Sequence, residues 1–318
     1  MIFGLLGGIF WAFETVIIGI AMGLSPFISD DRAIFLAPFV ATFLHDAFSA
    51  VFSFIYNVAR GEIRPMLRAA KTPAMRYVVL GAVIGGPIGM TGYLLAVNSM
   101  GSAIGAVASA IYPAVGTFLA WLFLKERVRW YQWIFLVVAL LGVFGLSYSP
   151  AAEGGSFLIG VLGAAMCAFG WGIEAVILAR ALSSGGIKHD YALVFRQASS
   201  AIVYGAVVLP IIGGWGFTAQ LFSGGIFPHV PVIAAAGLAA TLSFLFYYRA
   251  IAKQGAARAM ALNITYTAWA VILTVLWTRD LSILTPLTVI CALTVVVCGI
   301  LAATDVKNLF VKKNEIDN

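Results

Sequence analysis

FWAFETVI, residues 10 to 17, decides the fold of this chain, because a second copy of it, GWGIEAVI, occupies residues 170 to 177. The two copies are 160 residues apart and align Trp11 with Trp171 and Glu14 with Glu174. A carboxylate three residues after a tryptophan is rare inside an apolar run, so its recurrence indicates an internal duplication.

A second stretch repeats in the same order. HDAFSAV at 45 to 51 aligns with RQASSAI at 196 to 202, so that His45 lies opposite Arg196 and Asp46 opposite Gln197. The duplication therefore extends beyond one helix.

A third set of matches lies 154 residues apart. It aligns Gly101 with Gly255, Tyr93 with Tyr247, Tyr112 with Tyr266, Lys125 with Arg279 and Glu126 with Asp280. We take residues 1–150 as the first repeat and residues 151–318 as the second, which ends in a short tail, with the border in the weakly polar stretch 147 to 156.

The composition places this duplication in a membrane. The chain has 318 residues, 62% of them apolar and 10% charged, with a mean hydropathy of +1.01. A bilayer core about 30 Å thick requires roughly 20 apolar residues per helix. We predict an all-α protein with ten spans, at 2–22, 33–58, 74–97, 101–124, 130–149, 156–182, 190–212, 229–252, 257–277 and 282–303.

The number of helices per repeat sets the relative orientation of the two repeats. Five is an odd number, so the second repeat enters the membrane from the opposite side and the repeats are inverted. Basic residues concentrate on one side when both termini are cytoplasmic, as the positive-inside rule requires. We therefore predict a multi-pass protein of the bacterial plasma (inner) membrane, with an apolar external loop from Gly213 to Gly225.

Residues at membrane depth indicate a binding site. Because residues i and i+3 share a helical face, Trp11 and Glu14 face one cavity, and so do Trp171 and Glu174. Aromatic faces and a carboxylate suit a quaternary ammonium or related organic cation. We expect the substrate-binding residues to be Trp11, Glu14, Tyr93, Tyr112, Trp171, Glu174, Tyr247, Tyr266 and Trp269. Lipid-facing or packing roles for these rings are the alternative.

Proton coupling has candidates on the same helices. Carboxylates in a low dielectric bind protons readily, so Glu14 and Glu174 serve either as counter-ions or as proton carriers. His45 and Asp46 are further candidates, although as neighbours on a helix they are expected to point to different faces and not to line one cavity. Arg196 either snorkels to the interface or forms a structural or gating ion pair.

These features favour a secondary transporter without cofactor or metal. The partners are a small organic cation, protons and lipid, with no nucleic acid. A second hypothesis is export of amino acids or other small metabolites or drugs. A membrane-embedded enzyme is disfavoured, because no nucleophile or metal-ligand spacing accompanies His45 and Asp46. Buried thiols are expected at Cys167, Cys291 and Cys298.

The chain resembles the drug/metabolite transporter superfamily, EamA type. Within it, the sequence is similar to the LicB-type bacterial choline permeases, in the stretches GLLGGIFW (4–11), LSPF (24–27), HDAFS (45–49), GGPIGM (85–90), SAIYPA (109–114), CAFGWGIEAV (167–176), RQASS (196–200) and NITYTAW (263–269).

The resemblance implies proton-coupled choline import by alternating access. It places Trp11, Tyr112, Trp171, Glu174, Tyr247 and Trp269 in or near the site, and His45 and Asp46 match the family motif. Glu14 departs from the family pattern, where its counterpart is not acidic, and this favours another amine, a dication or altered proton coupling.

Overall fold

All the regular elements that the structure describes are helices. It is a computed structural model that describes residues 1–100, 110–146, 157–183, 187–223 and 228–305. In these ranges the all-α prediction is confirmed. Eight helical stretches are long and apolar enough to span a membrane: Ile2–Met22, Asp31–Ala59, Pro73–Ala96, Leu158–Ser183, His189–Ile212, His229–Gln254, Ala256–Thr278 and Pro286–Ala303. The other two predicted spans contain shorter apolar helices, so the total of ten stays a prediction.

The first half of the chain contributes eight described elements. They are α1 (Ile2–Met22), α2 (Asp31–Ala59), α3 (Ile63–Ala69), α4 (Pro73–Val83), the π-helix η1 (Ile84–Gly89), α5 (Met90–Met100), α7 (Tyr112–Phe123) and α8 (Trp130–Leu146).

The second half contributes ten described elements. They are α9 (Phe157–Ser183), α10 (His189–Val203), the π-helix η2 (Tyr204–Val208), α11 (Leu209–Ile212), α12 (Trp215–Ser223), α13 (His229–Gln254), α14 (Ala256–Asn263), α15 (Tyr266–Thr278), the 3-10 helix η3 (Leu281–Ile283) and α16 (Pro286–Ala303).

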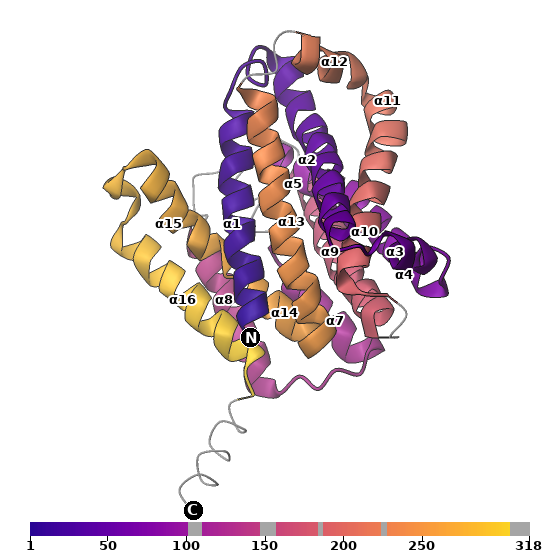
Figure 1. Ribbon diagram of the computed structural model, residues 1–318. Coiled ribbons are helices and arrows are strands. Elements are labelled where there is room, and N and C mark those ends of the chain that lie inside the picture. Colours follow the sequence, from indigo (N-terminus) through magenta and orange to yellow (C-terminus); the bar gives the residue numbers. More distant parts are fainter. Residues whose placement is uncertain (101–109, 147–156, 184–186, 224–227, 306–318) are drawn as a thin grey trace, which may run out of the picture.

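The predicted repeat matches each helix of the first half with a helix of the second half, and the packed helix pairs agree with this matching. In the repeat, α1 corresponds to α9, and α13 corresponds to the span that contains α5. Accordingly, α1 packs along α13 and α9 packs along α5. The two other close pairs join counterparts directly, α2 with α10 and α8 with α16 (Figure 1). This arrangement supports an approximate two-fold relation between the halves.

The backbone at one repeat-matched pair supports the same relation. Lys125 follows α7 and Arg279 follows α15, and their φ angles are 55° and 57°. Among the described residues they are the non-glycine positions with positive φ. Side chains other than glycine rarely adopt this region, so a match at two such positions indicates a common origin.

Both ends of the described chain lie at one end of the bundle. The Thr304 hydroxyl, just past α16, is 3.3 Å from the Met1 sulfur, and Figure 1 shows the start of α1 beside the end of α16. Asp305 forms an ion pair with Arg129 at 2.9 Å at this same end.

The predicted external loop at Gly213 to Gly225 is mostly helical, and that prediction was wrong. Helix α12 occupies Trp215–Ser223 and buries Phe217 and Leu221 against the bundle. These two apolar residues are four apart and so share one helical face, which explains why the segment folds. The predicted repeat border at 147 to 156 lies outside the described residues.

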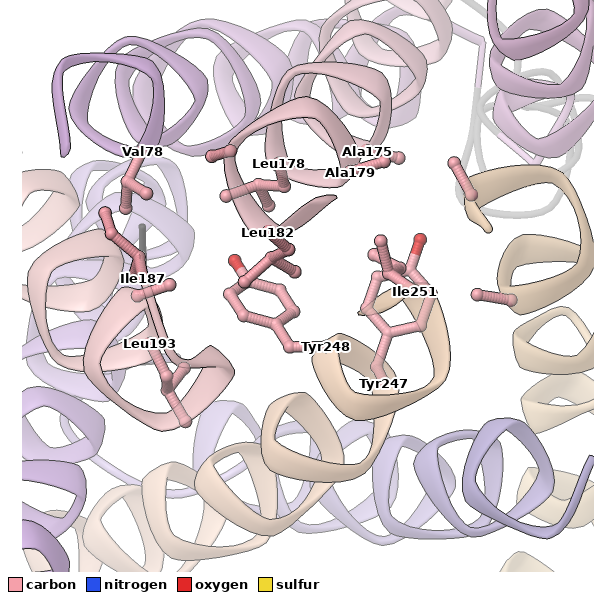
Figure 2. Packing of buried hydrophobic residues seen from close by; sticks show 14 of the residues in the cluster. Val78, Ala175, Leu178, Ala179, Leu182, Ile187, Leu193, Tyr247, Tyr248 and Ile251 are labelled. Carbon is pink, nitrogen blue, oxygen red and sulfur yellow. The ribbon is translucent and has the colours of Figure 1, made fainter. Parts of the chain in front are cut away.

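An apolar cluster packs α4, α9, α10 and α13 together. Figure 2 shows Tyr247 and Tyr248 of α13 beside Leu178 and Leu182 of α9, with Leu193 of α10 nearby. This cluster positions the polar helices that form the site. The three cysteines are buried, as expected.

Candidate functional site

A cavity of about 380 Å³ lies between α1, α2, α5, α9, α10 and α13. This volume falls in the range of small-molecule sites, about 300 to 1,000 Å³. Its lining includes the predicted site residues Trp11, Glu14, His45, Asp46, Tyr93, Tyr112, Trp171, Glu174, Arg196 and Tyr247. The structure thus brings together most of the residues singled out from the sequence.

Trp171 is the centre of an aromatic wall in this cavity. Its ring meets the repeat-matched Trp11 edge to face, with centroids 6.2 Å apart. It also meets Tyr112 edge to face at 5.4 Å and stacks with Tyr93 at 5.9 Å. The Trp171 indole N–H donates to the Gly85 carbonyl at 3.0 Å, which holds the ring in this orientation.

Two predicted binding residues do not line the cavity. Tyr266 lies behind Trp11 and stacks on it, with centroids 4.8 Å apart and the planes at 13°. Trp269 follows one turn later on α15 and is absent from the cavity lining. The alignment of the two repeats identified α15 as a helix near the aromatic wall. It did not distinguish the rings that line the cavity from those that pack behind them.

Charged side chains form a continuous chain across the cavity. Glu14 Oε1 lies 3.4 Å from His45 Nε2, and His45 Nδ1 lies 2.9 Å from Asp46 Oδ1. Asp46 Oδ2 lies 3.8 Å from the Arg196 guanidinium, which donates to both Glu174 oxygens at 2.7 and 3.2 Å. This series of charged side chains, from Glu14 to Glu174, joins the Trp11 side of the cavity to the Trp171 side.

The expectation that His45 and Asp46 cannot line one cavity was wrong. Neighbouring residues on a helix project about 100° apart, and the cavity extends around that much of α2, so both side chains reach it. His45 then lies between two carboxylates, from Glu14 on α1 and Asp46 on α2. This placement could not be read from helical spacing alone.

Arg196 does not snorkel to the interface. It is only 6% exposed and pairs with Glu174, which is 7% exposed. Its guanidinium carbon also lies 4.9 Å from the centroid of the Phe244 ring. Of the two sequence-based alternatives, the ion pair is the one observed, because burial leaves an unpaired guanidinium far costlier than a paired one.

The GGPIGM motif makes room for Glu174. Residues Ile84–Gly89 form a π-helix around Pro87, which lacks the amide hydrogen of a regular helix. A Cβ atom at Gly85 would collide with the Glu174 carboxylate, and one at Gly86 would collide with Ser200. The two glycines therefore let α9 and α10 approach this span closely. In the sequence, the Gly-Gly-Pro within an apolar run was the signal that could have indicated this role.

When all of its carboxylates are ionised, the cavity carries an excess of negative charge. Its three carboxylates, Glu14, Asp46 and Glu174, face one guanidinium and one imidazole. With His45 protonated, one net negative charge remains, and with His45 neutral, two remain. Within the part of the chain that the structure describes, no group of three or more His, Cys, Asp or Glu side chains is arranged for a metal ion. The arrangement suits an organic cation.

The cavity extends along α1 and α2 toward the end of the bundle away from Met1. Ile18, Met22 and Pro38 line it near the end of α1 and the start of α2. Closer to Met1, Gly4 and Gly7 let Leu262 and Tyr247 approach α1 closely.

Comparisons with known proteins agree with this geometry. Residues 1–148 match the EamA-like transporter family. Over 192 residues the chain is 30% identical to Protein LicB of Haemophilus influenzae, a match that spans 60% of this chain and 63% of LicB, less than two thirds of that protein. A solved protein crystal structure aligns with a TM-score of 0.71 over 95% of both chains at 18% identity, which shows the fold alone. The resemblance predicted from the sequence is confirmed.

Proposed function

We propose that this multi-pass transporter imports an organic cation, choline or a related quaternary ammonium, together with a proton. The match of residues 1–148 to the EamA-like transporter family supports a transport function. One observation carries the proposal: an aromatic wall and the chain from Glu14 to Glu174 line the same cavity. The similarity to LicB supports the substrate class.

The aromatic wall supplies what a quaternary ammonium needs. Its ammonium group has no N–H donors and is weakly hydrated, so the faces of Trp11, Trp171 and Tyr112 attract it without a large desolvation cost. Carboxylates supply the countercharge. Glu174 is already paired with Arg196, so Glu14 is the carboxylate that the substrate cation neutralises.

His45 is the proton carrier of the proposal. Protonated, it faces Glu14 and Asp46 at 3.4 and 2.9 Å, with Arg196 beyond Asp46. The five charged groups then sum to one negative charge, which one monovalent cation balances. Loading with one proton and one cation therefore leaves no net charge at membrane depth, where uncompensated charge is costly.

Alternating access completes the proposal. The cavity extends toward the end of the bundle away from Met1, which is the outer side if the termini are cytoplasmic. Inverted repeats allow the opposite access by rocking one half against the other. In this movement, the packing of α1 against α13 and the packing of α9 against α5 would change places. Helix α1 carries Glu14 and helix α9 carries Glu174.

Uptake into proteoliposomes tests this function. Labelled choline should accumulate when the interior is made alkaline, and His45→Gln should abolish that response to the pH gradient while choline exchange at equal pH persists. Amino acids offered instead test the export hypothesis for other metabolites. The proposal fails if no quaternary ammonium binds, or if His45→Gln responds to the gradient like the wild type.

A further inference from the structure

A second cavity, separate from the cation site, lies at the end of the bundle that holds Met1. Its volume is about 170 Å³, and it lies between α7, α8, α14 and α16. Water occupies about 30 Å³ per molecule in the liquid, so the space suffices for a small ion. Arg127 and Arg258 line it, together with Thr117 and Gln254.

The unpaired polar groups of this cavity, a hydroxyl and an amide nitrogen, can donate hydrogen bonds. Thr117 is 3% exposed, and its hydroxyl has no partner among the described residues. The Gln254 side-chain nitrogen is also buried without a partner in that part of the chain. Buried donors without partners are uncommon, because each costs about 1 to 3 kcal/mol. Such donors indicate a bound group that carries acceptors.

The acceptors in the cavity are already used. Glu126 accepts hydrogen bonds from the backbone amides of Ala256 and Ala257 at 2.8 and 3.1 Å, and so caps α14. Gln132 accepts from the Arg129 amide at 2.8 Å and donates to the Ala302 carbonyl at the same distance.

The net charge of the cavity also favours a group that carries acceptors, namely an anion. The carboxylate of Glu126 balances one of the two guanidinium groups, which leaves one positive charge. Within the described ranges, neither Arg127 nor Arg258 forms an ion pair with a carboxylate.

We propose that this cavity binds a small oxyanion of the phosphate class, held by Arg127 and Arg258 and by the hydroxyl of Thr117. Guanidinium groups bind phosphate oxygens strongly because several N–H donors face two oxygens at once. The anion comes either as free phosphate or as the headgroup phosphate of an anionic lipid. The site shares no lining residue with the cation cavity.

Binding by the full-length protein in an uncharged, lipid-stripped detergent solution tests the proposal. Radiolabelled inorganic phosphate in equilibrium dialysis probes the free anion. Native mass spectrometry with phosphatidylglycerol, and with phosphatidylcholine for comparison, probes the lipid source. We expect Arg258→Gln and Arg127→Gln each to weaken binding of the active probe at least tenfold, and Thr117→Val to weaken it severalfold. Arg127 is exposed, so its replacement leaves the fold intact.

Arg180→Gln is the matched control, because it removes the same charge from the exposed last turn of α9. Phosphate binding that Arg258→Gln weakens and Arg180→Gln does not supports a free anion. The same pattern for phosphatidylglycerol alone supports a lipid headgroup. Absence of binding by both probes overturns the proposal, as does an equal loss in Arg180→Gln.

Discussion

The two halves of the chain make the same contact with different chemistry. In the first half, Glu14 on α1 faces His45 on α2 at 3.4 Å, and in the second, Glu174 on α9 faces Arg196 on α10 at 2.7 Å. The predicted repeat aligns both carboxylates and both cationic partners. A pair whose basic member is a histidine, which can gain or lose a proton near neutral pH, therefore lies opposite a pair whose basic member is an arginine.

The residue after each basic side chain extends the comparison. His45 bonds to Asp46 at 2.9 Å, and the Arg196 guanidinium donates to the amide oxygen of Gln197 at 2.6 Å. In both halves the basic side chain contacts the side chain of the next residue, but that residue is the acidic Asp46 in the first half and the neutral Gln197 in the second. The comparison suggests that the second half supplies a fixed framework and the first half responds to protons and substrate.

Glu174→Gln breaks the fixed pair and should have the largest effect. It leaves the buried Arg196 guanidinium without its main counter-ion, and breaking a buried pair costs about 3 to 5 kcal/mol. Cation affinity should also fall at least tenfold, because the cavity loses a negative charge. Thermal unfolding in detergent and equilibrium choline binding measure the two effects.

A double variant is the control for this prediction. Glu174→Gln combined with Arg196→Gln removes both charges and should recover much of the lost thermal stability, since no buried charge is left alone. If Glu174→Gln alone unfolds at the wild-type temperature, the pair does not have the fixed structural role that the comparison assigns to it.

Glu14→Gln tests the responsive pair. We expect the choline affinity to fall at least tenfold, about 1.4 kcal/mol, with little change in unfolding temperature, because His45 can stay neutral and still bond to Asp46. Binding and melting curves compared with those of Glu174→Gln separate the two halves. Equal destabilisation by both variants would contradict the distinction.

Trp171→Ala and Trp269→Ala sharpen the comparison at the aromatic wall. Trp171 lines the cavity, so its loss should weaken cation binding about tenfold, within the range of desolvated cation–π contacts, about 2 kcal/mol. Trp269 is outside the lining, and its loss should change affinity less than twofold. Titration with choline measures both, and a larger effect from Trp269 would place the site elsewhere.

Much of this architecture was predictable because a bilayer and the predicted inverted repeat allow few arrangements. Trp11 and Trp171, matched in the sequence, meet in the structure at 6.2 Å. An ion pair of Arg196 was one of two alternatives, since sequence spacing does not give the depth of a side chain, and Glu174 was not predicted as its partner.

Other features depended on packing between helices that are distant in the sequence. Tyr266 shares the aromatic character of the wall but lies behind Trp11, a distinction that only the orientation of α15 decides. His45 and Asp46 share the cavity because it extends around α2, which helical periodicity does not describe. Helix α12 was missed because the glycines around it favoured a loop.

Lys125→Gly and Arg279→Gly test the repeat itself and should have the smallest effect. Both positions have a left-handed backbone, which costs an L residue roughly 1 to 2 kcal/mol and which glycine adopts without that cost. Glycine also has more conformational freedom in the unfolded chain, which offsets part of this gain. A net stabilisation of about 0.5 kcal/mol is therefore expected at each position. Lys125→Ala and Arg279→Ala keep the Cβ atom and should show no gain. Unfolding temperatures of the four variants measure this, and a gain at one position without the other would show that the two turns are not equivalent.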